Sequence, residues 1–475
     1  MERINKKIIV VFCVFVALFL GLVLYMTYFQ IVKAKDIATG EYSQYNRRHW
    51  VDENKVKRGT IYDSEGNILV ETQTDSDNNN FRKFTYGSIY SPITGFNSKN
   101  YGTSGLEKSY AKTLLNIKED TPLSELKKLV ETQEDGNNLV LTTNSTLQAY
   151  VMKLLRDNKG SIVVMNPRTG QVYAMASYPT FDPNTITSDW QDIVGNEEEA
   201  RLINRATQGL YTPGSVFKVV TATGILENQD KVESMTIEDE GSIKIGGYKV
   251  SNINGMVNGH TDLKKALVKS SNVYFSKLGS ELGQQVLSDV SKRYLIGEKF
   301  AFDLPTYKSK NGFYEGIDKA NIATTSFGQG NTLVTPLNMA MVMSAIANEG
   351  VMMQPYIVDK ITNPQGDVEF KKNPEILSKV TSPEIANEIL RDMMAVVEDG
   401  SEAGLSAVTV AGKSGTAEIK DKKSTNAWFI ATAPAKNPTI AVAVVLEDSG
   451  TGGDESAGPI ARETVRKALN LGLGN

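Results

Sequence analysis

Hydrophobic positions are spread unevenly along the 475-residue chain, and the first block of them stands apart from the rest. After MERINKK, residues 8–28 run for 21 positions without a charge. About 20 apolar residues cross a bilayer as a helix, whereas a cleavable signal peptide has an apolar core of only about 7–15. No small-residue cleavage site follows, so we expect residues 8–28 to be a retained transmembrane anchor. The alternative, a buried core helix, fits poorly with a helix that is apolar all round at the N-terminus.

The charges that flank this block predict its orientation. Arg3, Lys6 and Lys7 precede it and favour a cytoplasmic N-terminus, although the basic residues between 33 and 48 reduce the bias. We therefore expect residues 1–7 to be a cytoplasmic tail of a single-pass protein of the cell membrane. About 445 residues would then lie outside the cytoplasm.

Between residues 29 and 155 the pattern is polar and changes period several times. RGTIYDSEGNILVET at 58–72 predicts a β-hairpin with its turn at 63–67, and NNLVLTT at 137–143 predicts a further strand. Helical periodicity predicts three short amphipathic helices, the last begun by a capping serine: 107–117, 123–133 and 145–158. We interpret this part as a small α+β domain, which we call the pedestal.

From residue 156 to the C-terminus the apolar runs are longer. GSIVVMNPRTGQVYAMASYP predicts two buried strands joined by a tight turn at 166–170. The other predicted strands span 405–419, 426–434 and 438–448, and the predicted helices span 215–228, 261–269, 272–283, 336–349 and 458–471. Two strands, a helical middle, three strands and a final helix predict one α/β domain, with an antiparallel sheet covered by helices and a helical subdomain.

Composition removes several classes of function. The net charge of −4 gives no electrostatic basis for binding nucleic acid. The single cysteine, Cys13, allows no disulfide within the chain and no cysteine-rich zinc site. The glycine-rich segment 449–458 is expected to be a loop and lacks the lysine of a phosphate-binding loop, and the acidic segments lack calcium-loop spacing. We therefore expect no metal and no cofactor.

The segment QGLYTPGSVFKVV at 208–220 contains a candidate nucleophile. A Pro-Gly turn leads into a predicted helix whose first residue is Ser215. Serine nucleophiles commonly use histidine as their base, but the chain has only two histidines. His49 lies close to the anchor, and His260 lies in a predicted loop. The G-x-S-x-G pattern is also absent around Ser215, so a serine–histidine triad is not indicated.

Lys218 is the alternative base. Residues three apart share one face of a helix, so its amine can reach the serine hydroxyl. A free lysine has a pKa of about 10.4, but burial or neighbouring cations lower the pKa by several units. The helix start also offers N–H groups that stabilise negative charge. Ser215 and Lys218 can therefore form a nucleophile–base pair without histidine.

S-x-x-K alone is a weak signal, and its order relative to other motifs carries the information. The same spacing occurs at Ser109–Lys112 and Ser124–Lys127, on surface-like helices. Only Ser215 is followed by an S-x-N, SSN at 270–272, and then by KSGT at 413–416. SSN lies at a predicted break between two helices. KSGT lies on a predicted strand beside a glycine, which would leave room for a substrate backbone.

S-x-x-K, S-x-N and K-[ST]-G in this order resemble the signature of penicillin-binding proteins and serine β-lactamases. Other segments are similar to class B penicillin-binding proteins, including two that resemble the boxes of their pedestal (dimerisation) domain: 204–218, 326–350, 426–434, 58–70 and 101–110. The resemblance thus covers most of residues 58–470. The short pedestal, with no added C-terminal domain, resembles the compact penicillin-binding protein A type.

The resemblance implies a peptidoglycan D,D-transpeptidase that β-lactam antibiotics acylate and inhibit. Ser215 would attack the penultimate D-Ala carbonyl of a stem peptide, and a second stem peptide would supply the acceptor amine. Five catalytic residues are implied: Ser215, Lys218, Ser270, Asn272 and Lys413. The implied substrate-binding residues are Ser414, Gly415 and Thr416. Class B resemblance also implies a polytopic glycosyltransferase partner of the shape–elongation–division (SEDS) family.

Two departures from the family pattern stand out, and other readings stay open. Thr212 stands where the family usually has a second proline. Ser64 stands where the family frequently has an arginine, which puts in doubt a salt bridge within the pedestal. A β-lactamase would need a deacylation base, for which no candidate is evident. A D,D-carboxypeptidase would use water as acceptor. A membrane-anchored β-lactam sensor and an inactive scaffold are the remaining alternatives.

Overall fold

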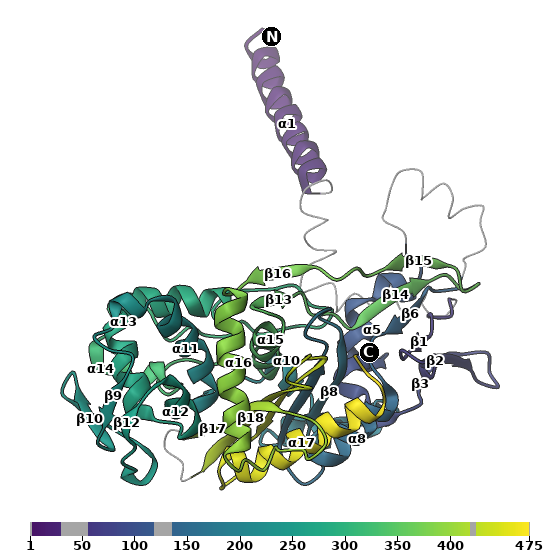
Figure 1. Ribbon diagram of the computed structural model, residues 1–475. Helices are drawn as coiled ribbons and strands as arrows, with labels where there is room; N and C mark the ends of the chain where they lie inside the picture. Colours follow the sequence, from purple (N-terminus) through teal and green to yellow (C-terminus); the bar gives the residue numbers. More distant parts are fainter. Residues whose placement is uncertain (1, 30–55, 118–134, 419–423, 475) are drawn as a thin grey trace. The chain divides into compact units, whose positions relative to one another are not determined.

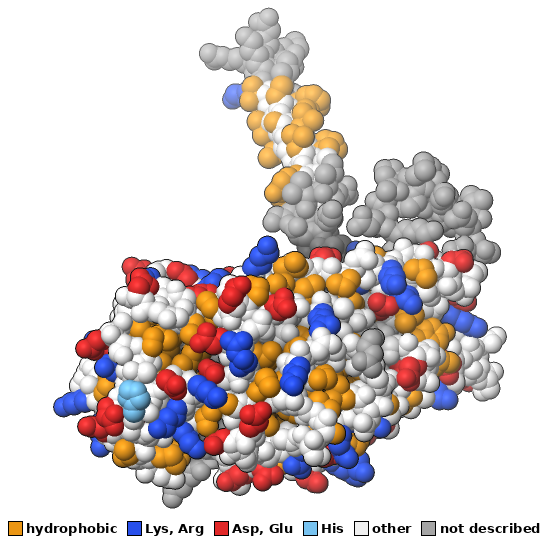
Figure 2. Space-filling view, in the orientation of Figure 1, with side chains coloured by type: hydrophobic (Ala, Val, Ile, Leu, Met, Phe, Trp, Pro, Cys, Tyr) orange, Lys and Arg blue, Asp and Glu red, His pale blue; other side chains and the backbone are white. Residues whose placement is uncertain are grey.

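The computed structural model describes residues 2–29, 56–117, 135–418 and 424–474 (Figure 1). The chain divides at residue 56 into two units, a small N-terminal one and a large compact one. The N-terminal unit contains helix α1, Glu2–Tyr28. Its stretch from Val10 to Tyr28 is long and apolar enough to cross a membrane and is not buried (Figure 2), which is compatible with the predicted anchor. The predicted helix at 123–133 and His49 lie outside the described residues.

The pedestal is built on a six-stranded mixed sheet in the order β15-β14-β6-β1-β2-β3. The predicted hairpin at 58–72 is confirmed, and a further antiparallel strand follows it. Strand β6 lies parallel to β1, pairing Leu139 with Ile61. The strands are β1 (Ile61–Tyr62), β2 (Ile68–Thr74), β3 (Asn80–Phe84), β6 (Asn138–Leu141), β14 (Val358–Thr362) and β15 (Val368–Lys371).

Strands β14 and β15 were not predicted, and they come from a part of the chain that follows the helical subdomain. β14 is antiparallel to β6 and places Ile361 beside Leu139. The Asp303 carboxylate accepts hydrogen bonds from the N–H groups of Ile357 (2.6 Å) and Val358 (3.0 Å), and the Tyr110 hydroxyl donates to the same carboxylate. The pedestal sheet is therefore completed by residues that lie more than 200 positions further along the sequence.

A buried ion network that does not involve Ser64 stabilises the pedestal. The Glu107 carboxylate is fully buried and contacts Arg58 at 3.0 Å and Arg82 at 2.5 Å. Burial raises the pKa of Glu107, but these two arginines outweigh it and hold the pKa below its ordinary value. Asp63, next to Ser64, accepts hydrogen bonds from within its own turn, among them from the N–H groups of Glu65 and Asn67. Asp63 therefore needs no arginine at position 64.

The pedestal helices are shorter than the sequence predicted. The predicted helix at 107–117 is two short helices separated at Tyr110, whose side chain reaches Asp303. The helix predicted at 145–158 ends at Leu155, and its cap is Asn144 rather than a serine, because the Asn144 side chain accepts from the N–H of Leu147 at 2.9 Å. The helices are α4 (Ser91–Thr94), α5 (Gly105–Ser109), α6 (Ala111–Leu114) and α8 (Ser145–Leu155), with the 3₁₀ turn η3 (Gly87–Ile89) and a small ladder of β4 (Asn97–Ser98) with β5 (Gly102–Thr103).

Residues 156–475 contain a five-stranded sheet, antiparallel throughout, in the order β17-β18-β19-β7-β8. The five predicted strands are confirmed, although the third begins at Ala411 rather than 405. Both faces are buried, and alternate residues of β19 enter two different apolar cores. The strands are β7 (Gly160–Met165), β8 (Val172–Tyr178), β17 (Ala411–Glu418), β18 (Thr425–Ala433) and β19 (Ile440–Leu446).

Helices cover both faces of this sheet (Figure 1). Helix α15, Pro336–Ala347, packs on one face, and α8 and α17 pack on the other. Helix α17 spans Gly453–Asn470, so the predicted loop at 449–458 is wrong for its last six residues. Asp454 and Glu455 in the first turn complement the helix dipole, and Ala457 is buried against the sheet. Glycine content alone was therefore a misleading loop signal.

The helical subdomain combines predicted and unpredicted elements. The predicted helix at 272–283 continues to Arg293 across a non-helical Gly283. Helix α16 has a clear apolar face and a Ser382 cap, so the sequence could have revealed it; α9 and α14 are short and more polar. The helices are α9 (Ile186–Gly195), α10 (Arg205–Gln208), α11 (Lys218–Glu227), α12 (Leu263–Val268), α13 (Asn272–Arg293), α14 (Lys319–Ser326) and α16 (Pro383–Glu398).

This subdomain also contains short two-stranded ladders, none of which was predicted. Strand β9 pairs with β12, β10 with β11, and β13 with β16, all antiparallel. His260 lies in β12 rather than in the predicted loop. The strands are β9 (Ile237–Asp239), β10 (Ser242–Ile245), β11 (Tyr248–Ser251), β12 (Gly259–Thr261), β13 (Val351–Met353) and β16 (Ile376–Lys379), with 3₁₀ turns η5 (Gln229–Lys231) and η6 (Ile253–Gly255).

Candidate active site

Ser215 lies in a single 3₁₀ turn, η4 (Gly214–Phe217), directly before α11. The α-helix therefore begins at Lys218 rather than at Ser215. The turn starts at Gly214, whose φ of +57° suits glycine and whose N–H donates to the Gly328 carbonyl at 2.9 Å. Phe217 is fully buried and anchors the turn, whereas Ser215 is half-buried. The serine is thus fixed at the boundary between core and solvent.

Residues before the turn tie it to the central sheet. The Thr212 carbonyl accepts a hydrogen bond from the Trp428 indole N–H on β18 at 3.0 Å. The Tyr211 hydroxyl donates to Glu447 at 2.6 Å, and Arg205 Nε donates to the same carboxylate oxygen at 2.9 Å. None of these supporting residues was predicted, because nothing in the local sequence links positions more than 200 residues apart. Thr212 contributes a backbone carbonyl here, an acceptor that a proline would also provide.

Lys218 brings the first two motifs together. Its Nζ lies 3.0 Å from Ser215 Oγ, 2.9 Å from Asn272 Oδ1, and within 3.0 Å of both oxygens of Ser270. Ser270 lies between α12 and α13, at the break that the sequence predicted, with a positive φ of +53° that is unusual for a residue other than glycine. The strained turn at Ser270 directs its hydroxyl and its carbonyl at the same amine.

Lys413 brings the third motif to the same point. It lies on the edge strand β17, and its Nζ is 3.2 Å from Ser270 Oγ and 3.1 Å from the Ser414 carbonyl. The Ser270 hydroxyl therefore lies between two lysine amines, which come from a helix and from a strand about 195 residues apart in sequence. The structure brings together all five residues that were predicted to be catalytic.

Both lysines are almost completely buried, and this changes their acid–base properties. Burial, and secondarily the charge of Lys413, lowers the pKa of Lys218 far below its ordinary value. Burial lowers the pKa of Lys413 to about 8, against the opposing effect of Asp454. Two amines in one dry pocket favour a state in which Lys218 is neutral and Lys413 is charged.

The contacts of Lys218 suit the neutral form. The Ser270 carbonyl and Asn272 Oδ1, which also faces Lys218, can only accept hydrogen bonds. A neutral amine has two N–H groups, which these two acceptors can take, and one lone pair, which is left for the hydroxyl of Ser215 or that of Ser270, each 3.0 Å away. Ser215 can donate its proton to that lone pair. The arrangement is that of a nucleophile with its base.

The remaining KSGT residues line the same strand but do not all reach the lysines. Ser414 and Thr416 alternate with Lys413 along β17, so their half-exposed side chains leave the strand on the other side. Thr416 Oγ1 accepts from the N–H of Gly453 at 3.1 Å. Gly415 packs against the nucleophile turn, since a Cβ there would lie 2.9 Å from the Pro213 carbonyl.

The glycine beside Lys413 makes room for a side chain of the neighbouring strand. A Cβ on Gly412 would lie 2.6 Å from the ring of Phe429, so this glycine accommodates a side chain of the neighbouring strand. Gly415 likewise accommodates the nucleophile turn. These contacts explain why glycine stands at both positions, and the substrate contact expected on this strand stays a prediction.

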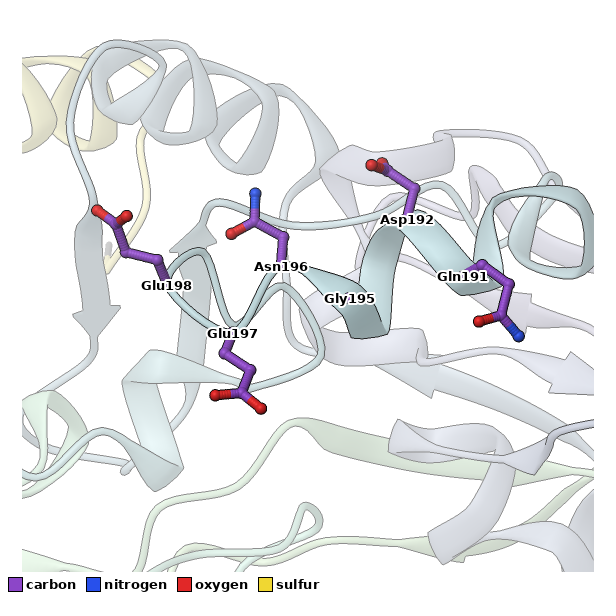
Figure 3. A pocket seen from close by; sticks show the side chains of 6 residues that line it. All are labelled: Gln191, Asp192, Gly195, Asn196, Glu197 and Glu198. Carbon is purple, nitrogen blue, oxygen red and sulfur yellow. The ribbon is translucent and has the colours of Figure 1, made fainter.

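An open cavity of about 670 Å³ is lined by one of the five residues, Asn272. It starts at Asn272 and runs between the β10–β11 hairpin and α14, with Glu418 at the end of β17 on its rim. Another hollow, of about 500 Å³, lies at the end of α9 (Figure 3). Its carboxylates, Asp192, Glu197 and Glu198, point in different directions, and no metal-binding group of acidic, histidine or cysteine residues occurs within the described ranges. Of these two cavities, only the first is lined by one of the five residues, Asn272.

The sequence alternatives do not form comparable sites. His260 is exposed on β12, and its backbone carbonyl accepts from Lys265. Ser109 and Lys112 lie on two different short helices, α5 and α6, on either side of Tyr110. The other S-x-x-K pair, at 124–127, lies outside the described residues.

Comparison with known proteins agrees with this geometry. The profile described as the penicillin-binding protein transpeptidase domain matches residues 160–466, and that of the penicillin-binding protein A dimerisation domain matches residues 58–139. The chain belongs to the penicillin-binding protein transpeptidase family. The resemblance to penicillin-binding proteins, inferred from the three motifs, is thereby confirmed. The α/β fold, predicted from the order of strands and helices, is confirmed as well.

Individual relatives of this penicillin-binding protein match it over most of its length. The peptidoglycan D,D-transpeptidase PbpA of Mycolicibacterium smegmatis is 30% identical over 456 residues, covering 90% of this chain and 92% of the relative. The D,D-transpeptidase domain of a peptidoglycan glycosyltransferase from Eggerthella lenta is 32% identical, with a TM-score of 0.80, covering 88% of this chain and 99% of that one. Penicillin-binding protein A from M. tuberculosis, solved as a ceftriaxone acyl-enzyme complex, is 27% identical, with a TM-score of 0.82 and coverage of 88% and 100%.

The close approach of Gly328 to the nucleophile turn generates a prediction. A Cβ on Gly328 would lie 1.8 Å from the Gly214 carbonyl oxygen, and φ is +85°. We expect Gly328→Ala to displace the turn by an ångström or more and to slow acylation by a fluorescent penicillin by about 100-fold.

Gly330→Ala is the matched control for this variant. Gly330 has nearly the same φ, +83°, but its Cβ would meet the Thr325 hydroxyl at 3.0 Å and no other atom closer than 3.6 Å. Both variants carry the same backbone strain, and only Gly328→Ala adds the collision with the turn. Equal acylation rates for the two variants would show that the turn is not held by this contact.

Proposed function

We propose that this protein is a peptidoglycan D,D-transpeptidase that cross-links stem peptides through an acyl-enzyme on Ser215. The observation that carries the proposal is the buried Lys218 amine, which lies 3.0 Å from Ser215 Oγ. The M. smegmatis relative is named a peptidoglycan D,D-transpeptidase, and the M. tuberculosis neighbour was solved as an acyl-enzyme with a β-lactam. Both support the same reaction class for this chain.

Acylation begins when Ser215 transfers its proton to neutral Lys218. The serine oxygen attacks the carbonyl carbon of the penultimate D-Ala, and the C–N bond to the terminal D-Ala breaks. The leaving amine needs a proton, and the Ser270 hydroxyl, within hydrogen-bond distance of both lysines, can relay one to it. The terminal D-Ala then departs, and the peptide remains esterified to Ser215.

The second half of the reaction reverses these proton transfers. The amine of a neighbouring stem peptide attacks the ester carbonyl, gives up a proton to the lysine–serine relay, and displaces Ser215 with its proton restored. A new amide bond forms and the enzyme is regenerated. β-Lactams would acylate Ser215 by the same first step and block it.

Backbone and side-chain groups around the turn can stabilise the charges that develop. The Thr416 carbonyl lies 2.7 Å from the position that a Cβ on Gly214 would occupy, so the polar backbone of Thr416 faces the nucleophile turn. An N–H and a C=O of one strand residue point to the same side, which supports an oxyanion site between the N–H groups of Ser215 and Thr416. Lys413, buried on one face of β17, would attract the substrate carboxylate through its charge, and Ser414 and Thr416, half-exposed on the other face, would bind it through their hydroxyls. Asn272 would bind the amide of the acyl chain.

The cellular arrangement follows from the anchor. Helix α1 would hold the protein in the cell membrane with residues 1–7 in the cytoplasm and the catalytic region outside, where peptidoglycan is assembled. We expect residues 29–155 to act as the pedestal and 156–475 as the transpeptidase domain. A SEDS-family glycosyltransferase that supplies glycan strands is the expected partner, contacted through the span and the pedestal.

Replacing the nucleophile tests the acylation step. Ser215→Ala should lose all covalent labelling by a fluorescent penicillin, because the other hydroxyl at the amine, Ser270 Oγ at 3.0 Å, is held between both lysines. Ser109→Ala is the matched control, since Ser109 has the same S-x-x-K spacing, and it should label like the unmodified protein. Residual labelling of folded Ser215→Ala, checked by circular dichroism, would rule out Ser215 as the nucleophile.

The pH dependence of acylation tests the role of Lys413. Its pKa of about 8 means that Lys413 loses its charge above that pH, and with it the attraction for the substrate carboxylate. The second-order rate of acylation should therefore fall about tenfold per pH unit well above pH 8. Lys413→Arg keeps its charge, so its rate should be lower overall but without this alkaline decline. A decline that persists unchanged in the arginine variant would assign it to another group.

Product analysis separates the transpeptidase from its alternatives. With a stem-peptide donor and an amine acceptor, we expect D-Ala release accompanied by a cross-linked peptide. D-Ala release with only the shortened donor would indicate a D,D-carboxypeptidase instead. Rapid turnover of a chromogenic cephalosporin would indicate a β-lactamase, and the absence of any product would indicate a sensor or scaffold.

A further inference from the structure

Asp239, at the end of β9, is a fully buried carboxylate that the mechanism above does not use. It accepts hydrogen bonds from the Ser271 hydroxyl at 2.6 Å and from the side-chain amides of Asn258 at 2.7 Å and Asn252 at 2.9 and 3.0 Å. The N–H of Gly241 donates a further bond at 3.0 Å. Within the part of the chain that the structure describes, no lysine or arginine forms an ion pair with Asp239. Neutral donors therefore satisfy a buried negative charge.

The partners of Asp239 also hold the S-x-N turn. Asn252 Oδ1 accepts from the backbone N–H groups of Asn272 (2.8 Å) and Val273 (3.1 Å), at the start of α13. Ser271 Oγ, while donating to Asp239, accepts from the N–H of Tyr274 at 3.0 Å. The residues that follow Ser270 are thus tied to one carboxylate, directly through Ser271 and indirectly through Asn252.

This scaffold explains how Ser270 keeps a strained conformation. A positive φ at a residue other than glycine is strained and persists only where the surroundings impose it. The turn presents two oxygens of Ser270 and one of Asn272 to Lys218. If the scaffold relaxed, these three contacts would be the first to change.

The carboxylate also acts on Lys218 through its charge. Burial raises the pKa of Asp239, but the hydrogen bonds from Ser271, Asn258 and Asn252 outweigh it and hold the pKa below its ordinary value, so the group stays ionised. Two charged groups face Lys218 from the elements packed around it: Lys413 on β17 favours the neutral amine, and Asp239 on β9 favours the protonated one. From α13 the nearest aromatic group is the uncharged ring of Phe275.

We propose that Asp239 is a positioning residue of the acylation reaction, which holds Ser270 and Asn272 against Lys218 and whose charge sets the lower pH limit of acylation. The inference rests on the proposed function, since it concerns the same nucleophile and base. It differs from that function in what it requires: acylation at Ser215 can occur whether or not Asp239 controls its pH range.

Asp239→Asn tests the charge and the scaffold together. An amide cannot accept all of the bonds that the carboxylate accepts, so we expect the maximal rate of acylation by a fluorescent penicillin to fall about 100-fold. Loss of the negative charge favours neutral Lys218, so the acidic limb of the pH–rate profile should move to lower pH. Asp262→Asn is the matched control: Asp262 is an exposed helix cap on the neighbouring α12, and its variant should keep both the rate and the limb.

Ser271→Ala separates the scaffold from the charge. It removes the direct link to Asp239 but leaves the carboxylate in place, so the rate should fall about tenfold while the acidic limb stays where it is. A role in folding alone would lower the thermal unfolding temperature without moving the limb in Asp239→Asn. The proposal is overturned if the limb does not move in folded Asp239→Asn, or if Ser271→Ala acylates at the rate of the unmodified protein. If the unmodified protein itself is not acylated at Ser215, the proposed function fails and this inference fails with it; if it is acylated, the two variants test the inference alone.

Discussion

The candidate active site depends on the burial of one amine, that of Lys218. Its side chain is fully removed from solvent, next to a second buried lysine, and no carboxylate among the described residues forms an ion pair with either. A buried charge without a partner costs several kcal/mol, which a lysine avoids by releasing its proton. The same burial that would destabilise an ordinary protein therefore produces a base at neutral pH. The surrounding polar groups need only place the Ser215 hydroxyl beside the amine of Lys218.

Three unrelated segments supply those groups, and each is held by packing rather than by local preference. The nucleophile turn is held by the Gly214–Gly328 hydrogen bond and by Trp428. The turn that contains Ser270 is held from behind by Asp239 and Asn252. The third segment is an edge strand, so one side of β17 has no neighbouring strand. A peptide substrate can bind along such an edge, beside Lys413 and close to Ser215.

The pedestal is joined to the catalytic region by more than a linker. Strands β14 and β15 complete the pedestal sheet although they follow the helical subdomain in sequence, and Asp303 fixes the entry to β14. Residues 57–475 consequently form one compact unit. A boundary drawn on the sequence near residue 155 separates the first four strands of the pedestal sheet from β14 and β15, which follow much later in the chain. The sequence did not reveal these two strands, because short strands with few apolar residues carry little periodic signal.

The sequence by itself determined the anchor-like apolar block, the strands of the central sheet and the three motifs. These depend on local composition, period and order, which the chain states directly. It also predicted that lysine rather than histidine would face Ser215, because residues three apart share a helical face. Only the tertiary structure decided which groups meet that lysine, what holds the strained turn at Ser270, and that Gly412 and Gly415 serve internal packing. Those contacts join residues dozens to hundreds of positions apart, and their distances are fixed by how the sheet, the turns and the helices pack, which no local pattern records.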